Sequence, residues 1–264
     1  MRVVVLPTAD DVSRRAADVI IGCVQKNSKA VIGLATGGTP LGTYRELVHA
    51  YQAGKISFRD VTTYNLDEYV GLGPDHPQSY RHFMREHLFS KTDFEATNCH
   101  VPDGLAGDYD QYCESYEQKI SQSGGIDLQL LGVGTDGHIG FNEPGSSLAS
   151  RVRLKALAKG TRADNSRFFA AGEEVPYLAV TMGVGTILDA RRILMLATGA
   201  NKANAVRAFI EGPITAQVTA SALQLHPQVT VLLDEAAAAW LQRREYYDDV
   251  ERIQLQLEHR QPNA

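Results

Sequence analysis

A short glycine-rich segment of the chain brings three titratable side chains within eight positions: Asp136, His138 and Glu143. The glycines between and beside them permit tight turns, so the three groups can converge. An imidazole beside carboxylates is a tunable proton shuttle, because the unperturbed pKa of histidine is about 6.5. The same residue types bind metals, but no second histidine stands at ligand spacing. The segment therefore predicts acid–base chemistry, with a helix cap and a satisfied histidine as the structural alternative.

Two further acids, Asp67 and Glu68, follow the apolar run Val61–Leu66. Neighbouring residues of an extended chain point to opposite sides, so only one of the two acids is expected to face a cleft. That carboxylate is a second candidate for proton transfer. A pair of solvated loop acids is the alternative.

A candidate phosphate-binding turn, Thr36–Pro40, joins the apolar run Ala30–Ala35 to a helical segment that begins at Leu41. Its two glycines allow close approach of the backbone to a ligand, and a helix N-terminus favours an anion. Thr39 is expected to cap the helix and Pro40 to occupy its first turn. The turn matches neither a Walker loop nor G-x-G-x-x-G, so an ordinary strand-to-helix turn is the alternative.

Two basic residues far along the chain are candidates to complete such an anion site. Arg167 lies in the segment Asn165–Phe169, and Lys202 begins a helix that follows an apolar run. Arginine offers a forked contact to a phosphate, and lysine offers a point charge. Solvated surface charges are the alternative for both.

Apolar runs alternate with helical patterns along the chain. Strands are expected at Val3–Leu6, Ala30–Ala35, Val61–Leu66, Ile126–Val133, Tyr177–Met182, Ile193–Thr198 and Val229–Leu233. Helices are expected at Val12–Cys23 behind a cap at Thr8, from Leu41, at Ser79–Phe89, Asp108–Gln122 and Asn201–Ile210, and from Asp234 past Trp240. The expected fold class is therefore α/β, a single domain over residues 1–264 with an open, largely parallel, doubly wound (Rossmann-like) sheet and helices on both faces. Ligands of such sheets bind beyond the carboxyl ends of the strands, where the candidate residues lie.

The composition limits what kind of protein this can be. The chain has 264 residues, 44% of them hydrophobic, and its formal net charge of −5 gives no support to a general nucleic-acid or anionic-membrane binder. Its three cysteines form no C-x-x-C pair, which excludes a simple disulfide framework and a thiolate zinc site. No segment has the apolar length of a signal peptide or of a membrane span. A soluble, cytoplasmic protein is expected.

Taken together, these segments resemble the glucosamine-6-phosphate deaminases, in the sugar-phosphate isomerase group that includes 6-phosphogluconolactonase. The resemblance covers nearly the whole chain in order and rests on Thr36–Pro40, Asn65–Leu72, Gly134–Pro144, Ser146–Arg151, Asn165–Phe169 and Ser221–Pro227, the last similar to a late strand of the family. It implies conversion of glucosamine 6-phosphate and water to fructose 6-phosphate and ammonia, without metal or organic cofactor. It also implies a mobile lid at about residues 153–182.

The resemblance implies a role for each candidate residue. His138 is expected to open the pyranose ring as acid and base, while Asp136 and Glu143 hold and tune its imidazole. Asp67 is expected to take the proton from carbon 2 and return it to carbon 1 through an enolamine. The turn and the two basic residues are expected to bind the phosphate: Gly37, Gly38, Thr39, Arg167 and Lys202.

Some members of this family are hexamers activated by N-acetylglucosamine 6-phosphate, which binds between subunits. The residues they use resemble Ser146, Arg153, Lys155 and Tyr246 here. Arg153 and Lys155 alternate along an expected strand, so both point the same way and can clamp one phosphate; a solvated basic edge strand is the alternative. This activator and a homo-oligomer, with a hexamer favoured, are the expected partners, whereas the final segment His259–Ala264 carries no family signature.

Two other functions fit parts of the pattern. A 6-phosphogluconolactonase of the same fold shares the phosphate turn and the imidazole but needs no carbon base, so Asp67 favours the deaminase. A non-catalytic sugar-phosphate sensor normally carries a DNA-binding module, and no room for one is expected before the strand at Val3. A sensor can also lose the proton shuttle, whereas all four residues of the shuttle are present here: Asp67, Asp136, His138 and Glu143.

Overall fold

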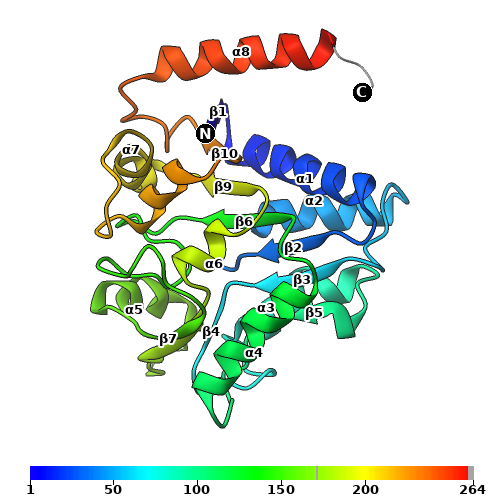
Figure 1. Ribbon diagram of the computed structural model, residues 1–264, viewed down its shortest axis with the longest axis vertical. Helices are drawn as coiled ribbons and strands as arrows, with labels where there is room; N and C mark the ends of the chain where they lie inside the picture. The colour runs from blue at the N-terminus through cyan, green and yellow to red at the C-terminus, as the bar shows by residue number, and fades with distance from the viewer. Residues whose placement is uncertain (171, 261–264) are drawn as a thin grey trace.

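A seven-stranded sheet forms the centre of the molecule (Figure 1). The computed structural model describes residues 1–170 and 172–260, with side chains described up to residue 258. The strands lie in the order β1 (Arg2–Leu6), β10 (Val229–Asp234), β9 (Ile193–Ala197), β6 (Leu128–Gly132), β2 (Val31–Leu34), β3 (Thr62–Asn65) and β5 (Cys99–His100). Every neighbouring pair is parallel, so the expected α/β class and parallel sheet are confirmed.

Helices cover both faces of this sheet, and each face has its own apolar core. One core lies under α1 (Ala9–Lys26), α2 (Leu41–Gln52) and α3 (Tyr80–His87), and the other lies under α4 (Tyr109–Gln122), α6 (Val184–Leu188) and α7 (Ala203–Glu211). Alternate strand residues enter opposite cores, as Val4 joins the first and Val3 the second. The strands are apolar on both faces because helices cover both.

Hydroxyl groups fix where two of the predicted helices begin. The Thr8 hydroxyl accepts a hydrogen bond from the amide of Asp11 at 3.1 Å, and the Ser79 hydroxyl accepts one from His82 at 3.0 Å. Each satisfies an amide that has no partner within its own helix. The cap predicted at Thr8 is confirmed, and the helix predicted from Ser79 begins with Ser79 as its cap.

A second sheet of three strands corrects the expectation of one continuous sheet. β4 (Asp67–Tyr69), β8 (Leu178–Thr181) and β7 (Arg153–Ala156) pair antiparallel, with β8 in the middle. The strand expected at Tyr177–Met182 therefore belongs to this sheet. Leu66 joins the two sheets. Its amide donates a hydrogen bond to the carbonyl of Leu34 in β2, and its carbonyl accepts one from the amide of Met182, which follows β8.

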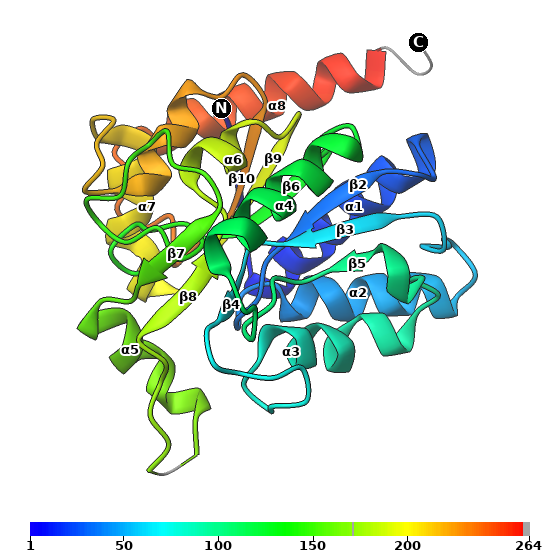
Figure 2. The same ribbon diagram turned by 60° about the horizontal axis from the view of Figure 1, so that its bottom comes forward.

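The segment expected to form a lid runs from β7 to β8. It contains α5 (Lys159–Asn165) and a short 3-10 helix, η3 (Ser166–Phe168). Figure 2 shows it projecting from the body of the molecule beyond β7 and β8. Its mobility stays a prediction, because the structure holds a single arrangement of the segment.

Two expectations for the C-terminal part are wrong. A buried 3-10 helix, η5 (Thr219–Leu225), stands where a late strand is expected at residues 221–227. The helix expected to begin at Asp234 does not form, since residues 235–240 form turns. The carboxylate of Asp234 accepts from the amide of Gly199 at 3.0 Å as well as from that of Ala237 at 2.8 Å, so it joins two loops instead of capping a helix.

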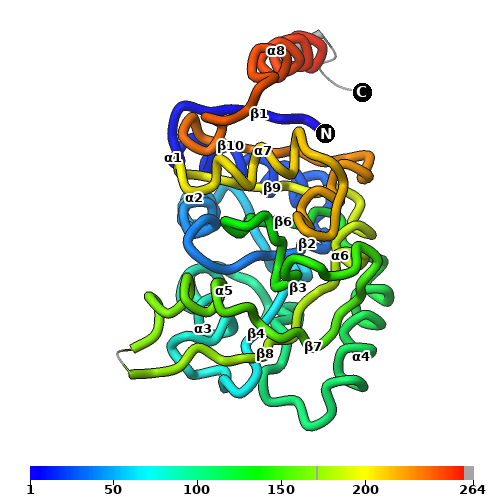
Figure 3. Tube along the Cα trace, turned by 90° about the vertical axis from the view of Figure 1, so that its left-hand side faces the viewer, coloured from blue at the N-terminus to red at the C-terminus, as the bar shows by residue number. Residues whose placement is uncertain are grey.

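The last helix is α8 (Arg244–Arg260), which lies along the outer side of β1 at one end of the molecule (Figure 3). Arg2 on β1 donates to the carboxylates of Glu251 at 2.6 Å and Glu258 at 2.7 Å. These contacts, the Glu251 hydrogen bond first, raise the pKa of Arg2 above its ordinary value. In the part of the chain that the structure describes, no helix is both long and apolar enough to cross a bilayer.

Candidate active site

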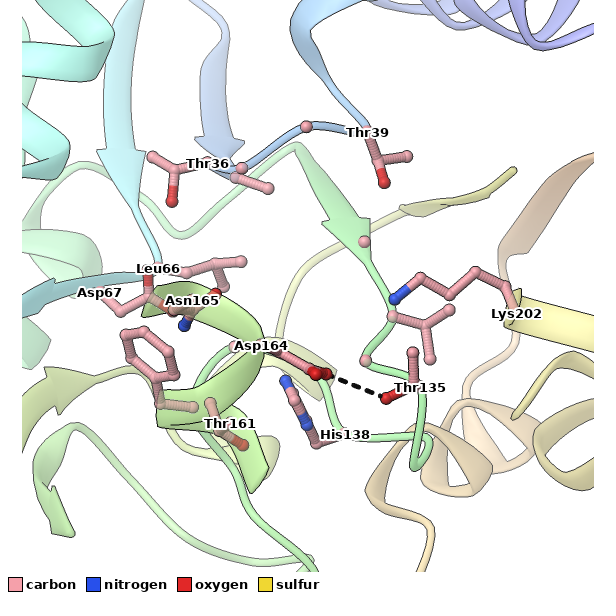
Figure 4. Close-up of a pocket in the computed structure, with 18 of the residues that line it drawn as sticks. Thr36, Thr39, Leu66, Asp67, Thr135, His138, Thr161, Asp164, Asn165 and Lys202 are labelled. Atoms are coloured by element: carbon pink, nitrogen blue, oxygen red, sulfur yellow. Dashed lines mark hydrogen bonds between the residues drawn. The ribbon is translucent and has the colours of Figure 1, made fainter. Parts of the chain in front are cut away.

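A cavity of about 400 Å³ opens at the carboxyl ends of the neighbouring strands β9, β6, β2 and β3 (Figure 4). Parallel sheets bind ligands at this edge because the strand-to-helix turns gather there. The loops after these strands line it, together with α5 and η3. Of the residues predicted from the sequence, those on its wall are Gly37, Gly38, Thr39, Asp67, His138, Arg167 and Lys202.

Asp67 begins β4, and its carboxyl group lies at the cavity although only 6% of the residue is exposed. Burial, followed by the nearby charge of Glu68, raises the pKa of Asp67 to about 8. The Glu68 carboxylate accepts hydrogen bonds from the amides of Tyr69 and Tyr80 at 2.9 Å and of Arg81 at 3.0 Å. Only one of the two adjacent acids therefore faces the cavity, as predicted.

Two glycines let the loop after β6 pass close to the functional side chains. A Cβ at Gly140 would lie 3.5 Å from Oδ2 of Asp67 and 3.1 Å from the hydroxyl oxygen of Thr181. A Cβ at Gly134 would lie 2.3 Å from Cε1 of His138, a distance that real Cβ atoms do not tolerate. The glycines seen in the sequence thus serve a close approach of backbone to side chains.

The imidazole of His138 is held by Asp136. Oδ1 of Asp136 lies 2.6 Å from Nδ1 and also accepts the backbone amide of His138 at 3.1 Å. With Asp136 ionised, this contact assigns the proton of the neutral ring to Nδ1 and leaves Nε2 free to accept. Burial opposes the ionisation of Asp136, but its hydrogen bond to His138 and the charge of that residue outweigh burial and lower the pKa of Asp136.

Glu143 is buried next to this pair. Its Oε1 accepts the amide of Ala158 at 2.9 Å, while Oε2 has no hydrogen-bond partner among the described residues. Ligand atoms of Asp136, His138 and Glu143 lie within 4.8 Å of one another, so the trio has the donors for a cation. The 2.6 Å contact fits a hydrogen bond better, because two atoms bound tetrahedrally to one zinc ion stand about 3.3 Å apart.

The phosphate-binding candidates lie across the cavity from Asp67. In Figure 4, Asp67 stands on one side, and Thr39 and Lys202 stand on the other. A Cβ at Gly37 or Gly38 would meet nothing within 4 Å, so the space beside the turn is open. Burial lowers the pKa of Lys202. This end of the cavity combines backbone amides with a half-buried cation, as an anion site requires.

The expectation that Thr39 caps α2 is wrong. Pro40 occupies the cap position and makes no side-chain hydrogen bond to the helix. Thr39 instead lines the cavity, with its hydroxyl group pointing inward (Figure 4). The first-turn amides of α2 therefore have no side-chain cap, which leaves them to water or to a bound anion.

The two cations predicted for phosphate binding, Arg167 and Lys202, come from different elements. Arg167 lies in η3 with its guanidinium 4.8 Å from the ring centre of Phe168, and Lys202 ends a short 3-10 helix before α7. In the described parts of the chain, no carboxylate lies within ion-pair distance of either residue. Both charges are therefore available to an anion.

The residues predicted for an activator do not meet within one chain. Ser146 is buried, and its hydroxyl has no partner among the described residues. Arg153 and Lys155 are half-buried alternate residues of β7, as predicted, and burial lowers the pKa of Arg153. Tyr246 is 53% exposed on α8, at the opposite end of the molecule from β7 in Figures 1 and 3.

Several residues on the cavity wall were not predicted from the sequence. The segment around α5 adds Thr161, Asp164, Asn165 and Phe168 beside Arg167, and Tyr80 comes from α3. Because β7 and β8 return the chain to the main sheet, residues remote in sequence meet the loop after β6. The signal that could have found Asp164 is its spacing from Arg167, since residues three apart share one side of a helix.

Comparison with known proteins agrees with this geometry. The sequence model of the glucosamine-6-phosphate isomerases/6-phosphogluconolactonase family matches residues 7–232. The glucosamine-6-phosphate deaminase of Cellvibrio japonicus (strain Ueda107) is 52% identical over 96% of each chain, and that of Hahella chejuensis (strain KCTC 2396) is 53% identical over 94% of each. A solved monomeric glucosamine-6-phosphate deaminase superposes with a TM-score of 0.89 at 45% identity, over 90% of this chain and 99% of that one. The 6-phosphogluconolactonase of Trypanosoma brucei shares the fold, with a TM-score of 0.72. It is 21% identical, and the match covers 90% of this chain and 97% of that one. The chain thus belongs to the glucosamine-6-phosphate isomerase/6-phosphogluconolactonase family.

Proposed function

We propose that this protein is a glucosamine-6-phosphate deaminase, which converts glucosamine 6-phosphate and water to fructose 6-phosphate and ammonia. One observation carries the proposal: a single cavity holds a buried carboxyl group of raised pKa, an oriented imidazole and a cationic end (Figure 4). Relatives that bear this name are about half identical to the chain over nearly its whole length.

The cationic end positions the substrate. The phosphate binds to the turn at Gly37, Gly38 and Thr39 and to Arg167 and Lys202, which line one cavity with Asp67. The sugar then extends from these groups across the cavity, with carbon 2 at the Asp67 carboxylate. Binding energy from the remote phosphate fixes the reacting carbon and so lowers the barrier to proton transfer.

His138 and Asp67 perform the proton transfers. Nε2 of His138 accepts the proton of the anomeric hydroxyl and delivers it to the ring oxygen, which opens the ring. Asp67 then removes the proton from carbon 2 and returns it to carbon 1 of the enolamine. The resulting imine at carbon 2 is hydrolysed by water and releases ammonia. Asp136 orients the imidazole, and Glu143 holds Ala158, the residue that precedes α5.

In the alternative function, lactone hydrolysis, Asp67 has no role in the reaction. A lactonase directs water to a carbonyl carbon and moves no proton between carbons, so it has no use for a buried carboxyl group whose pKa is about 8. The similarity to the Trypanosoma brucei lactonase is 21% and extends to the fold alone.

The test of the proposed function is release of ammonia and fructose 6-phosphate from glucosamine 6-phosphate, measured with and without EDTA. We expect stoichiometric release that survives chelation, because the proton transfers are assigned to side chains. Absence of release, combined with hydrolysis of 6-phosphogluconolactone by the same preparation, would assign the chain to the lactonases instead. Ligand binding without either reaction would indicate a sensor.

The proposal includes the remaining expectations from the sequence. Residues 1–264 act as one domain, and residues 153–182 act as a lid, since the segment between β7 and β8 carries Thr161, Asp164 and Arg167 to the cavity wall. The cytoplasm, where sugar phosphates are metabolised, is the proposed location.

Activation by N-acetylglucosamine 6-phosphate is supported by Arg153 and Lys155, which share one side of β7. Replacing Lys155 with alanine is expected to leave basal kcat within about 2-fold, because Lys155 does not line the cavity. The concentration of activator needed for half-maximal effect should rise about 5- to 150-fold, since removing a charge-assisted contact costs about 1–3 kcal/mol. An unchanged activation curve would show that the pocket lies elsewhere.

Self-association, with a hexamer as the expected form, is supported by α8. Val250, Ile253 and Leu257 lie at 3–4 residue spacing on one side of α8 and are 38%, 48% and 52% exposed. Such a stripe is typical of a helix that packs against another helix. The solved relative described as monomeric makes a direct measurement necessary.

Light scattering of the Ile253→Glu variant tests that interface. We expect a lower mass than that of the unaltered protein, because the new charge would be buried between subunits. Leu255→Glu is the matched control, since Leu255 is also exposed on α8 but lies on the other side of the helix. Equal masses for all three proteins would remove α8 from the interface.

A further inference from the structure

Besides Asp67, the described residues on the cavity wall include a second acid, Asp164, whose negative charge opposes binding of a phosphate. It lies on α5, is exposed to the cavity and precedes Arg167 by three residues. Figure 4 shows its carboxylate in the middle of the cavity, between Thr135 and His138. The ammonium group of Lys202 points into the same cavity. None of the proton transfers assigned above uses this residue.

The contacts of Asp164 keep its carboxylate in the cavity. The Thr135 hydroxyl, on the loop after β6, donates a hydrogen bond to Oδ2 of Asp164 at 3.3 Å. Lys202 is beyond ion-pair distance but close enough that the charge of Asp164 counteracts the lowering of the Lys202 pKa by burial. The negative charge of Asp164 therefore partly neutralises Lys202, a cation assigned to the phosphate.

A bound phosphate monoester changes the electrostatic interaction of Asp164 from attraction by Lys202 to repulsion by the phosphate. It carries a charge of about −1.5 to −2 at pH 7. A carboxylate and a phosphate are both negatively charged, so they repel each other across the few ångströms of partly hydrated space in the cavity. Arg167 is attracted by the same phosphate. The segment that carries Asp164 and Arg167 is thus pulled in by one side chain and pushed away by the other.

We propose that Asp164 competes with the substrate phosphate for the positive charge of Lys202 and thereby sets how tightly phosphorylated ligands bind. The inference rests on the proposed function only in taking the ligand to be a sugar phosphate. Asp164 is a determinant of affinity and not a catalytic residue, because it acts on ligand binding and takes no part in the proton transfers.

The test is the Asp164→Asn variant, in which the amide oxygen still accepts from Thr135 while the charge is removed. We expect the KM for glucosamine 6-phosphate and the Ki for inorganic phosphate to fall together, by about 3- to 10-fold at low salt, with kcat within 2-fold. The difference should shrink at high ionic strength because screening weakens the repulsion. Glu174→Gln is the matched control: it removes an equal charge from the same β7–β8 segment, on a residue that does not line the cavity.

Other results would overturn the inference. A higher KM with a lower Ki for phosphate would mean that Asp164 binds the amino or hydroxyl groups of the sugar. Unchanged constants would mean that it does not act on ligands. Binding of inorganic phosphate, measured by calorimetry on both proteins, separates this inference from the proposed function, because that measurement needs no turnover.

Discussion

Replacing Asp67 with asparagine is expected to lower kcat by at least about 10³-fold while the affinity for inorganic phosphate changes little. The carboxyl group is the one base placed to move a proton between neighbouring carbons, and general base catalysis is worth about 10²–10⁴-fold for each step it serves. Asp67 serves two steps here. Thr39 and Lys202, which are assigned to the phosphate, lie across the cavity from Asp67, so their contacts with a phosphate should remain. Exchange of the carbon 2 proton with deuterated solvent reports the first step directly.

The raised pKa of Asp67 also predicts a pH profile. The base must be ionised, so kcat/KM should fall about tenfold per pH unit below about 8, the pKa of Asp67. Turnover by the asparagine variant at the unaltered rate would exclude Asp67 as the base. A profile flat from pH 6 to 9 would contradict the assigned pKa.

The same substitution is expected to stabilise the fold. In the unfolded chain the pKa of an aspartate is about 3.9. In the fold the pKa of Asp67 is about 8. The folded protein therefore binds a proton that the unfolded chain has released, and its stability falls as the pH rises from about 4 to 8. Asparagine removes this dependence on pH. At pH 8 the free energy of unfolding of the variant should therefore be larger by roughly 1–2 kcal/mol, and its unfolding temperature should be higher.

Local signals in the sequence explain why much of the site could be predicted. The strands are runs of apolar residues, and Thr8 and Ser79 cap helices through bonds to amides three residues away. The candidate residues follow four of these strands, and a parallel sheet places all such ends at one edge. Asp67 and His138 could therefore be assigned to one cavity without knowledge of the contacts between them.

The remainder depended on contacts that no local pattern encodes. A strand was predicted at the position of β8, but β4 has only three residues and lies far from β8 in the sequence, so no local pattern indicates that the two pair antiparallel. Asp234 has the residue type of a helix cap, but its bond to Gly199 decided the local structure. Asp164 was not predicted, because its place in the cavity depends on a contact between α5 and Thr135 on the loop after β6. Tertiary bonds outweighed local preference in each case.

Removing the imidazole of His138 is expected to give the second large loss. His138→Ala should lower kcat/KM by about 10²–10⁴-fold, because ring opening loses the group that exchanges protons with the sugar. The Ki for inorganic phosphate should stay within about 2-fold, since His138 is not part of the phosphate-binding turn. Asp136→Asn should cause a smaller loss, because the ring remains but its orientation and proton position are less fixed.

Added imidazole distinguishes a chemical role of His138 from a structural one. The ring lines the cavity and lies against Gly134, so its removal leaves a space that opens to solvent and is shaped for the same ring. Free imidazole should therefore restore part of the activity of His138→Ala, in proportion to its neutral fraction as the pH is raised. No such rescue is expected for Asp67→Asn, because the asparagine amide fills the space of the carboxyl group and leaves no room for imidazole. If imidazole rescues neither variant while both remain folded, His138 acts through the packing of the loop after β6, and ring opening must be assigned to another group on the cavity wall.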